Sequence, residues 1–167
     1  MTTRKDYTYP EWNTLQSAIV GTSFYVRKLT PGFFDQLRIK YSTNKYIDEL
    51  EESHPDPFFK QLLNVDSFKS RVPKFVPRSA GGIEVPVLQA IDVSLEILAK
   101  KDPAKVEPFE KLILEIANST ADSIDGISPQ ESRAINEIIE VLNGRLQVAS
   151  KEDVVNAFAI NDSSGGI

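Results

Sequence analysis

A polar residue followed directly by proline occurs four times in this chain, and this pattern restricts the fold more than any other feature. The pairs are Thr30-Pro31, Asp56-Pro57, Asp102-Pro103 and Ser128-Pro129. The polar side chain can accept a backbone N–H of a first helical turn, and proline fits the next position because its missing N–H is not needed there. We therefore predict four capped helix starts and a mostly helical protein.

Apolar residues recur at helical spacing through most of the chain. In a helix predicted from Pro10 to Leu29, one stripe carries Trp12, Leu15, Ile19 and Val26. A second helix is predicted from Pro31 to about Tyr41, and a last short one starts at about Ser150. No strand pattern is found. We predict an all-α fold: a single-domain bundle of about seven helices.

Prolines and glycines interrupt the middle of the chain. They predict an extended crossover over residues 72–86. The crossover joins two halves, about 10–71 and 87–160, within a single domain that covers residues 1–167. A frayed tail is expected at 161–167. A shift of 98 positions pairs Leu15 with Ile113 and Thr30-Pro31 with Ser128-Pro129. This match indicates a weak internal pseudo-repeat, although any two helical hairpins share such spacing.

Composition excludes several kinds of chemistry. The 167 residues include no Cys and one His, His54, which excludes thiol nucleophiles and multi-His zinc sites. A net charge of -5 argues against nucleic acid as a partner. No run approaches the ~20 apolar residues of a membrane span, and no apolar stretch follows the first basic residues. The motifs G-x-x-x-x-G-K-[ST], G-x-G-x-x-G, H-E-x-x-H and G-x-S-x-G are absent. We expect a cytoplasmic protein without enzymatic activity.

Acidic residues around residue 125 form the first candidate site. Asp122, Asp125 and Glu131 are possible oxygen ligands for Ca²⁺ or Mg²⁺, since hard cations prefer carboxylates. Their spacing does not match an EF-hand, because Glu131 falls one position short of the required glutamate. In the alternative interpretation, Asp125-Gly126 makes a turn and Glu131 closes a capping box with Ser128.

A second acidic cluster contains Asp48, Glu52 and His54. Asp48 and Glu52 are i,i+4 neighbours, which His54 could join as a ligand, or the run is a solvated helix end. A third run, residues 68–78, is basic and aromatic. It suits phosphate or single-strand binding, or a loop anchored on the core by its aromatics.

The second half of the chain resembles the TerB-like (tellurite-resistance protein B) superfamily over about residues 87–142. The residues that carry the resemblance are Leu88, Ile91, Asp102, Phe109, Leu112, Ile116, Asp125-Gly126, Ser128, Glu131, Ile135 and Ile138. It implies an all-α bundle with an internal pseudo-repeat and a stress-linked, metal-sensing scaffold without established catalytic activity. The first half departs from the motif, with Arg27-Lys28 where Asp125-Gly126 stand. A metal site built from both halves is therefore in doubt.

Three functional hypotheses follow. The first is a non-enzymatic, bacterial, stress-linked TerB-like domain that binds a divalent cation through Asp122, Asp125 and Glu131. The second is a protein–protein interaction module without metal, which would dock a protein partner. The third is a small hydrolase that uses His54 with Asp48 or Glu52.

Overall fold

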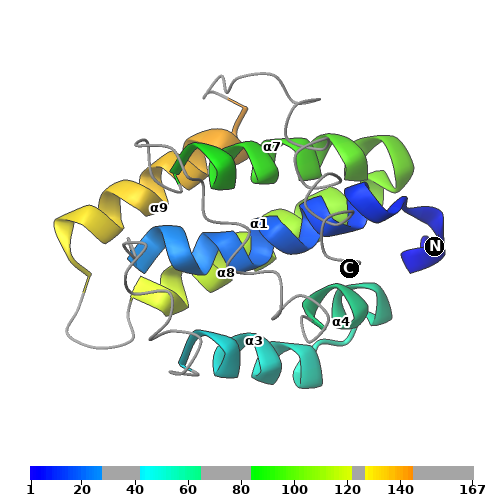
Figure 1. Ribbon diagram of the computed structural model, residues 1–167, viewed down its shortest axis with the longest axis horizontal. Coiled ribbons are helices and arrows are strands. Elements are labelled where there is room, and N and C mark those ends of the chain that lie inside the picture. The colour runs from blue at the N-terminus through cyan, green and yellow to red at the C-terminus, as the bar shows by residue number, and fades with distance from the viewer. Residues whose placement is uncertain (28–41, 65–83, 122–126, 145–167) are drawn as a thin grey trace, which may run out of the picture.

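The computed structural model describes residues 1–27, 42–64, 84–121 and 127–144 (Figure 1). Within these ranges the chain contains six α-helices and two short 3₁₀ helices. In chain order they are η1 (Arg4–Asp6), α1 (Tyr9–Arg27), α3 (Ser42–Ser53), α4 (Pro57–Leu63), α7 (Glu84–Lys101), η3 (Pro103–Lys105), α8 (Val106–Ala121) and α9 (Pro129–Leu142). No strand occurs in these ranges, so the all-α prediction is confirmed. The helices predicted at 31–41 and from Ser150 lie outside the described residues.

Helix α1 is the central element of the bundle. Figure 1 shows it between α7 and α9 on one side and α3 and α4 on the other, and α1 contacts α4, α7, α8 and α9. The predicted apolar stripe is buried, but so is every other residue from 12 to 26. Two buried threonines satisfy their hydroxyls within the helix: Thr14 Oγ1 donates to Pro10 O at 2.8 Å and Thr22 Oγ1 to Ala18 O at 2.6 Å. Small polar residues therefore take core positions here.

Of the four predicted caps, Asp56 and Ser128 are found as expected, and Thr30 lies outside the described residues. Asp56 Oδ1 accepts the Phe58 amide at 2.9 Å at the start of α4. Ser128 and Glu131 form a complete capping box at the start of α9: Ser128 Oγ accepts the Glu131 amide at 3.2 Å, and Glu131 Oε2 accepts the Ser128 amide at 2.7 Å. After α9, Gly144 has φ +70°, the left-handed conformation that favours glycine.

Two local predictions hold only in part. Asp102 takes the N-cap position of the 3₁₀ helix η3, with Pro103 in its first turn, as predicted. Its side chain makes no cap bond, because the carboxylate accepts hydrogen bonds from Thr2 instead. The crossover was predicted to extend to residue 86, yet α7 begins at Glu84. The rest of that prediction, residues 72–83, lies outside the described residues. Pro86 lies in the first turn of α7, where a backbone N–H has no acceptor within the helix, so proline does not prevent helix formation.

The buried side chains form one cluster drawn from all six α-helices. At the N-terminal end of α1, four aromatic rings contact one another: Tyr7, Trp12, Phe58 and Phe59, with neighbouring centroids 5.1–5.7 Å apart. These contacts fix the N-terminal segment and α4 against the same end of α1. None of the helices described here has the length and apolar character needed to cross a membrane.

Candidate functional site

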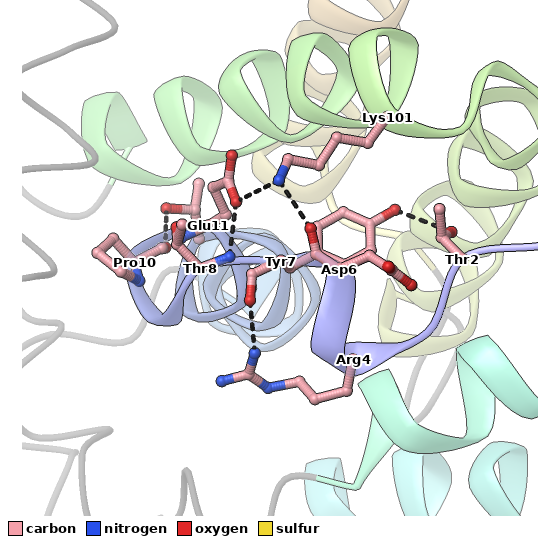
Figure 2. A network of polar contacts seen from close by, with 9 residues as sticks. Thr2, Arg4, Asp6, Tyr7, Thr8, Pro10, Glu11 and Lys101 are labelled. Carbon is pink, nitrogen blue, oxygen red and sulfur yellow. Dashed lines mark hydrogen bonds and ion pairs between the residues drawn. The ribbon is translucent and has the colours of Figure 1, made fainter.

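The N-terminal segment is held to the end of α7 by Lys101 (Figure 2). Lys101 Nζ donates to Asp6 O at 2.8 Å, pairs with Glu11 Oε2 at 3.0 Å and lies 5.4 Å from the Tyr7 ring centroid. Burial acts to raise the pKa of Glu11, but hydrogen bonds from the Thr8 amide and from Lys101 outweigh it and lower that pKa. One lysine thus links three neighbouring groups at the start of the chain.

Asp102 makes a second attachment for the same segment. Its Oδ2 accepts the Thr2 amide at 3.2 Å and Thr2 Oγ1 at 2.8 Å, and the Thr2 hydroxyl lies 3.2 Å from Tyr7 Oη. The bonds from Thr2 lower the pKa of Asp102. The carboxylate is therefore a tether for the N-terminus rather than a helix cap.

Lys105 is a buried cation beside Asp56, the N-cap residue of α4. Its Nζ pairs with Asp56 Oδ2 and lies 5.5 Å and 5.8 Å from the ring centroids of Phe58 and Phe59. Burial acts to raise the pKa of Asp56, but hydrogen bonds from Lys105 and the Phe58 amide outweigh it and lower that pKa. The pair joins η3 to the start of α4.

His54 has a role in the turn between α3 and α4. Its Nδ1 accepts the Asp56 amide at 3.1 Å, and its ring lies 5.1 Å from that of Phe59. Through Nδ1, His54 therefore stabilises the turn that leads into α4.

Only part of the two predicted acidic sites falls within the described residues. In residues 1–27, 42–64, 84–121 and 127–144, no three His, Asp or Glu side chains come together to hold a metal ion, so the structure does not assemble Asp48, Glu52 and His54 as a ligand set. Asp122 and Asp125 lie outside the described residues, as does the basic run at 68–78. Glu131 is described, and its Oε2 closes the capping box.

A buried tyrosine connects α1 to α9. Tyr25 Oη donates to Glu137 Oε2, whose other oxygen accepts from Arg133 Nε at 2.8 Å. The pKa of Tyr25 is raised mainly by burial and, to a smaller extent, by the neighbouring Glu137 carboxylate. The hydroxyl stays protonated at neutral pH, and its role is to satisfy a polar contact between two packed helices.

A hollow of about 740 Å³ lies between η1, α1, the end of α3 and α4. Its lining includes the cationic residues Arg4, Lys5 and Lys60, together with Trp12, Gln16 and Glu51. This size falls in the range of small-ligand sites, about 300–1,000 Å³. We call this hollow the N-terminal cleft.

No sequence pattern predicts the N-terminal cleft, because Lys60 is far along the chain from Arg4 and Lys5. The available signal was a basic pair shortly before the only tryptophan, Trp12.

Comparison with protein-family models, curated proteins and solved structures finds no match to this chain. The resemblance to TerB-like proteins thus rests on the motif residues alone.

Proposed function

We propose that this chain is a non-enzymatic, stress-linked domain of the TerB-like kind, bacterial and cytoplasmic, which works by binding a divalent cation, Ca²⁺ or Mg²⁺. The observation that carries the proposal is the hairpin of α8 and α9. Helix α8 ends at Ala121 and α9 begins at Pro129, behind the capping box of Ser128 and Glu131. The acidic residues Asp122 and Asp125 belong to the connection between these helices.

The capping box leaves room for a second role of Glu131. Its Oε2 is engaged by the Ser128 amide, but a carboxylate has two oxygens and about four acceptor positions. A cation held by Oε1 and by carboxylates of the preceding connection would bind the native state only, because the capping box orients Glu131 only in the folded chain. Cation binding would then stabilise the fold.

Thermal unfolding of EDTA-treated protein, titrated with Ca²⁺ and Mg²⁺, tests the proposal. At a hundredfold excess of metal over Kd the expected stabilisation is about 2.7 kcal/mol, which raises Tm by roughly 5–10 °C in a chain of this size. The informative variants are Asp122→Asn, Asp125→Asn and Glu131→Gln. Glu131→Gln keeps an acceptor for the Ser128 amide and removes the charge, so it separates cation binding from helix capping.

Glu140→Gln is the matched control, since Glu140 is an exposed residue on α9 outside the motif. A saturable rise in Tm that the motif variants abolish and Glu140→Gln preserves supports the proposal. A flat response at millimolar metal refutes it and favours the protein–protein interaction module. Equal loss in Glu140→Gln refutes the residue assignment.

A further inference from the structure

The N-terminal cleft concentrates positive charge in an acidic chain. Its lining holds three cationic side chains, Arg4, Lys5 and Lys60, and one acidic side chain, Glu51. The lining therefore carries +2, while the whole chain carries -5. In the parts of the chain that the structure describes, no carboxylate pairs with Lys5 or Lys60. Both lysines are exposed. Their charges are therefore available to a ligand.

Arg4 is held in position before any ligand arrives. Its Nη1 donates to Tyr7 O at 2.9 Å, and its guanidinium carbon lies 5.1 Å from the Trp12 ring centroid. A guanidinium carries five N–H donors in a rigid plane, of which this bond uses one. The remaining donors suit a carboxylate or phosphate, which an arginine binds in a two-point contact.

Gln16, which also lines the cleft, pairs with backbone carbonyl oxygens that would otherwise repel an anion. It is buried, and its Nε2 donates to Leu62 O at 3.2 Å and to Asn64 O at 3.1 Å. These two carbonyls close the C-terminal end of α4, where unpaired carbonyl oxygens would repel an anion. The contact also fixes α4, and with it Lys60, against α1.

We propose that the N-terminal cleft binds a small polyvalent anion through its carboxylate or phosphate groups. Arg4 and Lys5 bind it from the N-terminal segment and Lys60 binds it from α4. Charges on two elements that converge on one cleft favour an anion with more than one charged group. This site lies on elements other than the α8–α9 hairpin, so it stands apart from the proposed cation site.

Trp12 makes the test direct, because the only tryptophan of the chain lines the cleft beside Arg4. Tryptophan fluorescence of the full chain would be followed at low ionic strength during titration with tripolyphosphate in one arm and citrate in the other. The arm with the tighter binding identifies phosphate or carboxylate as the preferred group. The expected result is a saturable change in at least one arm.

Three variants make the result specific. The double variant Lys5→Gln, Lys60→Gln should weaken binding by about tenfold or more, because two of three charge contacts are lost. Arg4→Lys keeps the charge but loses the two-point contact, and should also weaken it. Lys111→Gln, on α8 and outside the lining, should leave Kd within about twofold. Far-ultraviolet circular dichroism establishes that each variant is folded.

Two results would overturn the proposal. One is the lack of a saturable change with either anion in the unsubstituted chain. The other is an equal loss of affinity in Lys111→Gln, which would assign the effect to overall charge.

Discussion

The ion pair between Lys105 and Asp56 should contribute far more to stability than a surface pair. The side chains are 10% and 23% exposed, and Asp56 also caps α4. Exposed pairs contribute about 0–1 kcal/mol, and breaking a fully buried pair costs about 3–5 kcal/mol. Because this pair is mostly but not fully buried, we expect a coupling energy of about 2 kcal/mol, between those limits.

A double-mutant cycle isolates that energy. Lys105→Met keeps the packing of the side-chain stem on Phe58 and Phe59, and Asp56→Asn keeps an acceptor for the helix cap. The lost cation–π contacts and the changed cap appear in both the single and the double variants, so they cancel in the coupling term. Free energies of unfolding come from urea denaturation at pH 7 for all four proteins.

The pair of Lys111 with Glu107 provides the control cycle. It is an i,i+4 pair whose side chains are both 74% exposed, and its coupling should be about 0.3–0.5 kcal/mol. If Lys105 and Asp56 couple no more strongly than this control, burial does not strengthen their interaction and the reasoning is wrong.

The coupling should also depend on pH, with a sign fixed by Asp56. Its pKa is lower in the folded chain than in the unfolded one. The contribution is therefore complete above the unfolded value, about 3.9, and it disappears as pH falls through the folded value. Coupling that persists unchanged at pH 2 would contradict the ionic origin.

Three smaller perturbations test the local reasoning, each by urea denaturation. Gly144→Ala should cost about 1 kcal/mol, because φ of +70° strains an L residue although no atom lies within 4 Å of the added Cβ; an unchanged stability would disprove the left-handed cap. Ser128→Ala should cost about 1 kcal/mol through loss of the cap bond, while Ser128→Asp should restore most of it. Ser17→Ala should leave stability unchanged or raise it by up to about 1 kcal/mol, because Ser17 Oγ is buried without a partner in the described structure; a clear loss would reveal a hidden hydrogen bond.

The candidate sites show which contacts can be predicted from neighbouring residues in the sequence and which cannot. The capping role of Glu131 was readable from Ser-Pro-x-Glu, because both of its hydrogen bonds stay within four residues. The contact of His54 with the Asp56 amide is equally local. In contrast, Arg4, Lys5 and Lys60 converge only when α4 packs beside the N-terminal segment. No spacing rule joins residues 55 positions apart.

By itself the sequence determined the helical class and the helix starts at Asp56-Pro57 and Ser128-Pro129, since caps and prolines act on the backbone within one turn. Tertiary structure decided which faces are buried. The stripe of α1 predicted one buried face, but packing on several sides buries Gln16 and Ser17 as well. Tertiary structure also brought Asp102 into hydrogen bonds with Thr2 and Lys105 into an ion pair with Asp56. These choices depend on partners 100 and 49 positions away, which become neighbours only once the hydrophobic core has formed.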